Sequence, residues 1–353
     1  MVLPAYHGDS IIVKTIDSNG NPFHMLIDGG TAQTYDNTLK NELRKIEFID
    51  VLVLTHVDSD HIAGLIKFFK SPFFKPSQIG KYWFNSKNIK FLRNSETISL
   101  SQAKTLEELL IDKGELKEKW AEDIYIGVTP VVPPGISIEV LSPTKDVLDD
   151  LYGKWPDLSA EYNKKLRDIN ISSSIASSQI DRGSLADLAE NDDTPEKSIF
   201  EDLFNSSSIA FVLRTFDLSV LLLGDSHTEL IKQALISKNY SVQKRLKVDL
   251  VKVSHHGSKN NTMNDVLDMI DCDRFIISTN GGSSDHTHPD RETIARIIYH
   301  PERVTSNFEK HRKIYLNYPR IEVERKAGKF VDDKDLSVGN WELVEGTNIF
   351  EYE

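Results

Sequence analysis

The sequence predicts an α/β fold in which layers of β-strands are covered by helices. Short apolar runs rich in β-branched residues recur along the chain, each bounded by polar residues, as expected for buried strands. Runs with the helical spacing of leucine and isoleucine follow several of them. Three strand-like runs in the second half lead into aspartate or histidine, and sites in layered α/β folds gather at such strand ends.

The chain is long enough for one large core with a small appendage. It has 353 residues, of which 39% are hydrophobic and 27% are charged, which is ordinary for a globular protein. We expect a main domain over residues 1–300 and a C-terminal β extension of the same domain over residues 301–353. Short strands are predicted in that extension at residues 313–316, 321–325 and 341–344.

Charge and cysteine content limit the partners and the compartment. The formal charge of −12 argues against a general basic surface for nucleic acid, although bound divalent metals would reverse the sign locally around a phosphate-bearing substrate. The single Cys272 excludes an intrachain disulfide and a cysteine-based zinc cluster. No apolar run approaches the roughly 20 residues that span a bilayer, and the first residues lack a signal-peptide pattern. We therefore expect a cytoplasmic protein without membrane contact.

A β-hairpin opens the chain. Residues 10–15 and 23–27 are strand-like, and the turn residues 17–21 lie between them. The second strand ends in Asp28-Gly29-Gly30, where glycines let the backbone turn sharply. Alone, this tripeptide predicts only a turn, but its distance along the chain from the polar motif at residues 56–61 favours a functional role for Asp28.

The stretch from Leu54 to Gly64 carries the densest chemistry of the chain. It follows the apolar run 48–54, which predicts a buried strand, and leads into a helix-like run over residues 62–70. A loop can turn several side chains to one side, which a strand with alternating faces cannot. Imidazole together with carboxylate suits zinc, manganese or iron rather than calcium. The four side chains able to bind a metal here are His56, Asp58, Asp60 and His61.

A simpler alternative is a polar loop in which Asp58 or Asp60 caps the following helix. That alternative accounts for one acid, but it does not account for two acids together with two histidines. The pattern therefore favours a metal site whose remaining ligands come from elsewhere in the chain.

Residues 62–95 reverse the charge of this acidic chain locally, with lysines and one arginine but no acid, and with aromatic residues interleaved. One interpretation is a patch for a phosphate-bearing substrate, with rings available for base stacking. The other is that the aromatic residues belong to the core and the lysines form a solvated rim. The strand-like run 81–84 favours the second interpretation.

The middle of the chain changes character. Residues 99–113 predict a helix and residues 136–141 a strand. Residues 170–207 are polar, rich in serine and poor in aromatic residues, which predicts a flexible insertion rather than a second core. This insertion is a candidate for gating or for contact with a protein partner or a second copy; the alternative is an ordinary disordered loop.

The second half restarts the strand pattern and supplies further polar strand ends. Such a pattern is hard to obtain from packing alone, because buried polar groups cost free energy unless they are paired. Strands are predicted at 209–214, 218–223, 248–253 and 275–278, followed by Gly224-Asp225, by His255-His256, and by a loop with His286 and His288 before a helix over 291–299.

The series His-x-Asp-x-Asp-His after an apolar strand resembles the metal signature of the metallo-β-lactamase superfamily, with Asp58 where a second histidine usually stands. That substitution is similar to the hydrolase-like domain of competence DNA-uptake channels and to the phosphorylcholine esterases. Asp28-Gly29-Gly30 and Gly224-Asp225 resemble further superfamily motifs. The resemblance implies a four-layer αββα sandwich with a polar insertion near residues 170–207.

The resemblance also implies a ligand set for two divalent ions, zinc or manganese, that share Asp225. Neighbouring residues at a strand end are hard to separate by sequence, so His256 remains an alternative to His255. A histidine that usually completes the first site is absent from residues 205–208, where water would take its place. The first ion would take His56, Asp58 and Asp225, and the second Asp60, His61, Asp225 and His255, with Asp28 supporting the metal loop from behind.

Further roles follow from the same resemblance. Asp60, His256 and His288 are expected to act in catalysis, with His288 contacting phosphate or donating a proton and His286 the less favoured of the late pair. Ser258 and Lys259 are expected to bind substrate. His7-Gly8-Asp9-Ser10 resembles the opening strand of the family, where His7 or Asp9 lies either near the cleft or at the surface.

These residues imply a binuclear metal-dependent hydrolase, and the leading hypothesis is a phosphodiesterase or nuclease in which the metal pair turns water into hydroxide at neutral pH. Its substrate would carry phosphate, as a nucleic acid or a nucleotide does. Asp58 in place of histidine favours harder metals such as manganese. The alternatives are a hydrolase of a small ester, lactone or thioester with the same metals, and a non-catalytic interaction module on the same fold.

Overall fold

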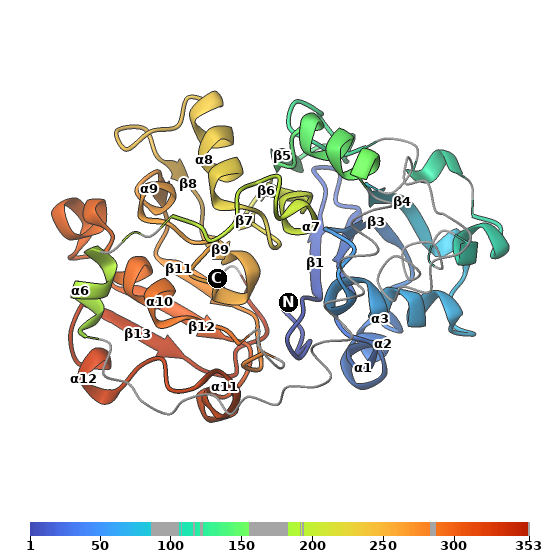
Figure 1. Ribbon diagram of the computed structural model, residues 1–353. Helices are drawn as coiled ribbons and strands as arrows, with labels where there is room; N and C mark the ends of the chain where they lie inside the picture. Colours follow the sequence, from blue (N-terminus) through green and yellow to red (C-terminus); the bar gives the residue numbers. More distant parts are fainter. Residues whose placement is uncertain are drawn as a thin grey trace.

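The computed structural model of the chain describes residues 1–85, 106, 108–115, 117–120, 123–154, 183–190, 192, 194–282 and 287–351. Two β-sheets dominate it, and Figure 1 shows the N-terminal sheet on one side and the C-terminal sheet on the other. The first sheet has the order β1-β2-β3-β4. Its strands are β1 (Ile11–Ile16), β2 (Pro22–Ile27), β3 (Ile49–Leu54) and β4 (Ile79–Phe84).

The second sheet has seven strands in the order β13-β12-β11-β9-β7-β6-β5. The pairs β5–β6 and β6–β7 are antiparallel, and the remaining neighbours run parallel. Its strands are β5 (Ser137–Ser142), β6 (Ala210–Arg214), β7 (Ser219–Leu222), β9 (Leu250–Lys252), β11 (Arg274–Ile277), β12 (Arg312–Leu316) and β13 (Trp341–Val344), and a separate parallel pair is formed by β8 (Leu246–Lys247) and β10 (Ile270–Asp271).

Helices cover the outer faces of both sheets. Among the described residues, no helix has the length and apolar character needed to cross a membrane. The helices are α1 (Ala32–Thr34), α2 (Lys40–Leu43), α3 (Ser59–Lys70), α6 (Leu185–Glu190), α7 (Leu203–Ser206), α8 (Thr228–Ser237), α9 (Asn264–Leu267), α10 (Arg291–Tyr299), α11 (Arg320–Ala327) and α12 (Asp333–Leu336).

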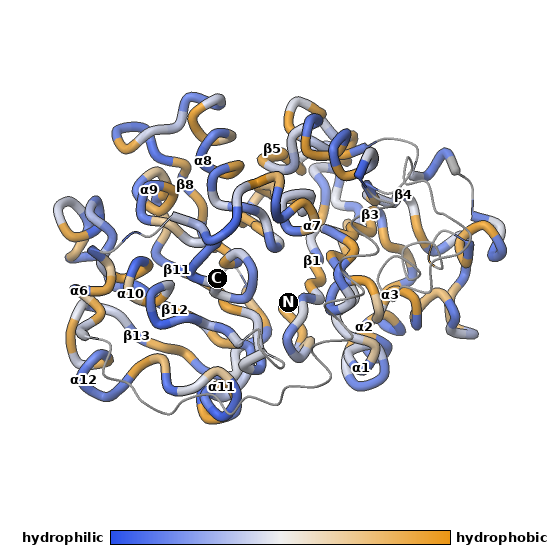
Figure 2. Tube along the Cα trace, in the orientation of Figure 1, coloured by the Kyte–Doolittle hydropathy of each residue, from blue (hydrophilic) through white to orange (hydrophobic). Residues whose placement is uncertain are grey.

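Three apolar clusters hold the layers together and confirm the predicted four-layer αββα order. The central cluster lies between the sheets, where Trp83 of β4 meets Phe211 of β6 with ring centroids 6.0 Å apart. A second cluster joins the first sheet to α3, and a third joins the second sheet to α8 and α10. In Figure 2 hydrophobic and hydrophilic stretches alternate along single elements, as expected when one face of an element is buried.

The strand β3 illustrates why these residues form a central strand. Val51 and Val53 point into the central cluster, whereas Leu52 and Leu54 point towards α3. A strand buried on both faces needs a continuous apolar run. The run is interrupted only by Asp50, whose carboxylate accepts from the backbone N–H of His24 at 2.8 Å.

Most of the predicted elements are confirmed within one or two residues, but the strand predicted at residues 321–325 is wrong. That segment is the helix α11, in which Arg320 and Glu324 form an i,i+4 ion pair at 2.8 Å. Ile321 and Val323 alternate as in a strand, yet only Val323 is buried. The helix-forming charged residues of the segment, such as Glu322 and Arg325, decide the conformation. The strands predicted at 313–316 and 341–344 are confirmed and continue the second sheet.

Among the described aromatic residues of the segment 62–95, all belong to the core except Phe73, which is 46% exposed. Phe68, Phe69 and Tyr82 are at most 1% exposed, and the residues beyond 85 lie outside the described part of the chain. This result supports the interpretation of a core with a lysine rim. Of the helix predicted over 99–113, residues 108–112 are helical.

The segment 170–207 is described from residue 183, except for residues 191 and 193. There Leu185 and Ala189 of α6 pack into the core cluster of the second sheet, and the carbonyl oxygen of Lys197 meets Nε2 of His227 at 3.0 Å. The flexibility expected for this insertion, and its role in gating or partner contact, stay predictions.

We predict that Phe211→Ala lowers the free energy of unfolding by about 3–5 kcal/mol, because it opens a cavity between the two sheets. Phe216→Ala, five residues along the same hairpin, should change it by less than about 0.5 kcal/mol, since Phe216 is 97% exposed. Urea unfolding followed by circular dichroism measures both. Equal losses in the two variants would contradict the central position of Phe211.

Candidate metal centre

Three loops and the first turn of α3 meet at one end of the sandwich, and the carboxylate of Asp225 lies at their centre. Asp225 follows β7, and the imidazoles around it come from the loop after β3, the first turn of α3 and the loop after β9. The distances from its Oδ2 are 3.8 Å to His56 Nε2, 3.4 Å to His61 Nε2, 3.5 Å to His256 Nε2 and 3.9 Å to His255 Nε2.

The other acids of the predicted motif lie beside the same imidazoles. Oδ2 of Asp58 is 3.6 Å from His56 Nε2, and Oδ2 of Asp60 is 3.9 Å from His61 Nε2 and 3.6 Å from His256 Nε2. Tetrahedral ligands with bonds of roughly 2.1 Å lie roughly 3.4 Å apart, so these separations fit a cation between the groups. Two sets whose ligand atoms all lie within 4.8 Å of one another are His56, His61 and Asp225, and Asp60, His61 and His256.

The hydrogen bonds of the Nδ1 atoms leave Nε2 of each imidazole free for a ligand. Nδ1 of His61 lies 2.8 Å from Asp28 Oδ2, and Nδ1 of His256 lies 2.8 Å from the carbonyl oxygen of Ser278. Both partners only accept, so Nδ1 carries the proton in each ring. In the neutral rings the lone pair is then on Nε2, which faces the carboxylates.

Thr55 fixes the third imidazole in the same way. Its hydroxyl donates to Asp28 Oδ2 at 2.7 Å, so the Thr55 oxygen accepts from Nδ1 of His56 at 3.1 Å. The backbone N–H of Thr55 donates to Asp28 Oδ1 at 2.8 Å. Asp28 is fully buried and orients two candidate ligands at once, which is the role that carboxylates behind metal-binding histidines usually have.

The buried polar atoms of the cluster fit bound divalent cations. Within the described residues, Nε2 of His56, His61 and His256 and Oδ1 of Asp225 are buried without a hydrogen-bond partner. Leaving such groups unsatisfied is costly. Cations bound to the imidazole nitrogens would remove that cost, and imidazole with carboxylate is a donor set for zinc or manganese.

The local sequence positions the first motif without using its acids as helix caps. Asp58 is the N-cap residue of α3, but its side chain makes no capping hydrogen bond, so the simple capping alternative is wrong for this residue. Close backbone approach fixes the loop: a Cβ on Gly64 of α3 would lie 1.9 Å from the carbonyl oxygen of Gly29. Glycine at both positions lets the end of β2 pack directly on α3.

The two histidines after β9 both have left-handed backbone conformations, with φ of 46° for His255 and 55° for His256. Such values are uncommon outside glycine and mark constrained turns, often at functional sites. The turn brings His256 into the second ligand set. His255 lies at its edge, with Nδ1 bonded to Asn261 Oδ1 at 3.1 Å. The geometry thus favours His256, the alternative left open by the sequence.

Charge and burial shift the pKa values of the cluster in opposite directions. Burial alone lowers the pKa of His61 and raises that of Asp225, but the combined attraction of several opposite charges around each group outweighs burial. The carboxylate of Asp225 and its neighbours raise the pKa of His61 well above its usual value, and His256 and His61 hold the pKa of Asp225 well below its usual range. Burial lowers the pKa of His255 to about 4, so that ring is neutral at pH 7.

The remaining predicted residues lie on the rim. His288 packs against His255 with ring centroids 5.3 Å apart, and its Nδ1 lies 3.2 Å from Asp290 Oδ2. The same Asp290 oxygen accepts from the backbone N–H of Lys259 at 2.8 Å. The hydroxyl of the buried Ser258 accepts locally from Asn260 N–H at 3.3 Å. His286 lies outside the described residues.

Sequence reasoning missed Lys252, which is buried behind Asp225. The ammonium pairs with Asp9, and although burial disfavours its charge, Asp9 and Asp225 raise the pKa of Lys252. The signal was a lysine inside the apolar strand 248–253, where a charged side chain is unexpected. Asp9, for which a surface role had been an alternative, is 1% exposed.

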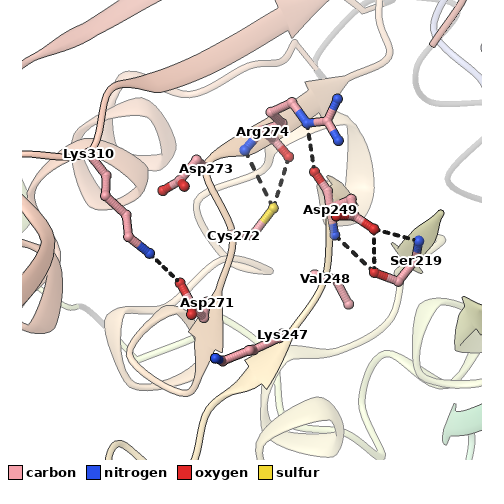
Figure 3. A pocket seen from close by; sticks show the side chains of 9 residues that line it. All are labelled: Ser219, Lys247, Val248, Asp249, Asp271, Cys272, Asp273, Arg274 and Lys310. Atoms are coloured by element: carbon pink, nitrogen blue, oxygen red, sulfur yellow. Dashed lines mark hydrogen bonds and ion pairs between the residues drawn. The ribbon is translucent and has the colours of Figure 1, made fainter. Parts of the chain in front are cut away.

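A polar pocket of about 310 Å³ lies at the opposite end of the strands from the cluster around Asp225 (Figure 3). It is lined by residues at the beginnings of β7 and β11, among them Ser219 and Arg274. Several of its charged groups are engaged locally: Lys310 pairs with Asp271 at 3.2 Å, and Asp249 accepts from the hydroxyl of Ser219 at 2.6 Å. It shares no residue with the cluster around Asp225.

Comparison with known proteins agrees with the first part of the site. Residues 9–87 match the family model of the metallo-beta-lactamase superfamily, a stretch that contains Asp28 and the motif from His56 to His61 but ends before Asp225. No curated protein matches the sequence significantly.

Two solved structures align over most of the chain with low similarity. A protein from Parabacteroides distasonis, provisionally named a metal-dependent hydrolase, has 9% identity, covers 95% of this chain and 98% of its own, and gives a TM-score of 0.34. The E377D mutant of the CmlA β-hydroxylase has 13% identity, covers 94% of this chain and 52% of its own, and also gives a TM-score of 0.34. At these scores neither structure informs the chemistry of the site.

We predict that Asp225→Asn reduces the number of divalent ions bound by the purified protein, because every candidate imidazole faces this carboxylate. Asp249→Asn is the matched control, since it removes a carboxylate from the opposite end of the same sheet. Elemental analysis after dialysis against Zn²⁺ or Mn²⁺ gives the stoichiometry. Full metal content in Asp225→Asn would refute the central position of Asp225 in a metal site.

Proposed function

We propose that the protein is a binuclear metal-dependent hydrolase that cleaves phosphodiester bonds. The observation that carries the proposal is the convergence of three imidazole Nε2 atoms on one carboxylate oxygen at 3.4–3.8 Å, with these nitrogens buried and without other partners. Packing alone gives no reason to gather such groups, because each of them loses its hydration.

In this proposal the ligands divide into two sets that share Asp225. His56 and Asp58 hold the first ion with Asp225, and the neutral His255 is the imidazole available to complete it. Asp60, His61 and His256 hold the second ion with Asp225, and the four separations among these groups lie between 3.4 and 3.9 Å. This assignment gives His256 the place on the second ion that was expected for His255, and it moves His255 to the first ion.

Ions bound there would lower the pKa of a coordinated water from about 15.7 towards 7 and would stabilise the negative charge that develops on phosphate. The side chains of the protein do the rest. Asp28 and Thr55 hold the imidazoles in one tautomer. The carboxylate of Asp290 accepts from Nδ1 of His288 and stabilises the doubly protonated ring, whose Nε2–H would donate its proton to the leaving oxygen.

The choice of a phosphodiester rests on two features. Asp58 stands where most superfamily members have histidine, as in the relatives that the sequence resembles, the uptake-channel domain and the phosphorylcholine esterases. The added carboxylate favours a harder ion such as manganese. On the rim, Lys259 beside His288 is the cation available for a phosphate, the role expected for it from the sequence. A nucleotide or nucleic acid strand is therefore the proposed substrate.

We predict that the protein with Mn²⁺ or Zn²⁺ hydrolyses bis-p-nitrophenyl phosphate faster than p-nitrophenyl acetate. The phosphodiester would use both ions at once, whereas the acetate ester needs only a polarised carbonyl. Release of p-nitrophenol, followed by absorbance with each metal and with chelator, measures both. Turnover of the acetate alone would favour the alternative of a small-ester hydrolase, and absence of bound metal would favour a non-catalytic module.

We predict that His288→Ala lowers the rate of phosphodiester hydrolysis by ~10²–10⁴-fold while the metal content stays unchanged, because His288 packs against His255 but is not itself a ligand in either set. Asp290→Asn should cause a smaller loss by releasing Nδ1 of His288. His311→Ala, which removes a half-exposed histidine near β12, is the control. If His288→Ala loses its ions, His288 is a ligand and the assignment is wrong.

A further inference from the structure

A buried lysine lies directly behind the candidate metal centre. The side chain of Lys252, the last residue of β9, is 1% exposed. Its ammonium contacts the carboxylate of Asp9, donates to the carbonyl oxygen of Gly224 at 3.3 Å and lies 4.0 Å from Oδ1 of Asp225. Lysine is almost never fully buried unless it is paired, so its position beside a candidate ligand calls for a specific reason.

The ammonium divides the surroundings of Asp225 in two. Oδ2 of Asp225 faces the imidazoles, as described above, whereas Oδ1 is buried without a hydrogen-bond partner and faces Lys252. The charge of Lys252 therefore acts on Asp225 from the side opposite to the imidazoles.

Asp9 ties this lysine to the metal loop and to a ligand histidine. It follows Gly8, where a Cβ would lie 1.8 Å from the carbonyl oxygen of Asp60, so the N-terminal loop packs directly on the first turn of α3. Oδ1 of Asp9 lies 3.7 Å from Nδ1 of His256 and has no hydrogen-bond partner. Asp9 thus stands behind the cluster on the side where Lys252 lies.

The formal charges of the cluster limit what it can hold. Five carboxylates and one ammonium lie in or directly behind it, which leaves a formal charge of −4 with neutral imidazoles, and two divalent cations neutralise that charge. Without the lysine the formal charge would be −5, one negative charge more than two divalent cations neutralise. Without Asp9 it would be −3, one negative charge fewer. The carboxylates are those of Asp9, Asp28, Asp58, Asp60 and Asp225, and the ammonium is that of Lys252.

We propose that the ion pair of Asp9 and Lys252 adjusts the charge of this centre to two divalent ions. The inference rests on the proposed metal centre and gives Lys252 and Asp9 a positioning role, because neither touches substrate. If the ion pair served only the packing of the core, removing its negative charge and removing its positive charge would have the same effect on metal affinity.

The test uses Asp9→Asn, Lys252→Met and the double variant in the full chain. Mn²⁺ or Zn²⁺ is titrated by calorimetry into protein freed of metal by chelator. Asp9→Asn should weaken binding by about tenfold or more, because the remaining ammonium repels the ions, and Lys252→Met should bind at least as tightly as the wild type. The double variant restores the balance and should bind within about threefold of the wild type.

Urea unfolding of the metal-free variants separates charge from packing. Both single variants should unfold at lower urea concentration, because each leaves a buried charge without its partner. Lys252→Met therefore lowers stability without lowering metal affinity. The control Asp335→Asn removes the partner of the buried Arg291, 2.6 Å away, and should lower stability with metal affinity unchanged. If one single variant does not fold, the other is compared with the double variant, and equal metal affinity in the two overturns the inference.

The outcomes are distinct. Three results would overturn the inference and leave the proposed function standing. They are weaker metal binding in both single variants, wild-type metal affinity in Asp9→Asn, and a loss of metal affinity of more than about tenfold in the double variant. Wild-type protein that binds one ion overturns the charge balance. Wild-type protein that binds no ion overturns both the inference and the proposed function.

Discussion

The concentration of buried carboxylates around three imidazoles is the constraint on which the rest of the structure depends. Charged groups of one sign repel each other strongly where water is excluded, so the three most deeply buried acids of the cluster, Asp9, Asp28 and Asp225, each lie beside groups of opposite charge or hydrogen-bond donors. Asp28 is satisfied by Thr55 and His61, and Asp9 by Lys252. Asp225 is the acid whose partners are mainly the imidazoles and the lysine behind it. The backbone around the cluster is correspondingly rigid, with glycine at close approaches and two left-handed histidines in succession.

These supports differ in origin from the ligands that they hold. The imidazoles and acids of the cluster come from loops at the carboxyl ends of β3, β7 and β9, whereas the supports come from the strands themselves or from the N-terminal loop. Thr55 directly follows β3, Lys252 ends β9, and Gly8 packs on Asp60. Residues on a packed sheet move little, so they fix the tautomer and the direction of each ring. The proposed chemistry therefore depends on the sheets as much as on the loops.

The sequence predicts those parts of the molecule in which the signal is local. The motif from His56 to His61 is recognised because four ligating side chains within six residues have no packing explanation, and β3 because an apolar run precedes it. Where the answer depends on three-dimensional context, the sequence is ambiguous or misleading. His255 and His256 are separated only by the left-handed turn. The strand predicted at 321–325 is a helix because Ile321 is exposed, and Lys252 is noticed only once its burial beside Asp9 is known.

The division of the cluster between the two sheets links its formation to the packing of the sandwich. The acids and imidazoles from His56 to His61 belong to the first sheet and α3, whereas Asp225 and His256 belong to the second sheet. Bringing them together concentrates negative charge, which opposes association of the sheets. The apolar surface between the sheets, which includes Trp83 and Phe211, supplies the opposing free energy. The apolar interface between the sheets thus holds the site in place without contributing a ligand to it. Because the apolar contacts and the charged cluster occupy different parts of the molecule, the fold can be stable in spite of the concentrated charge.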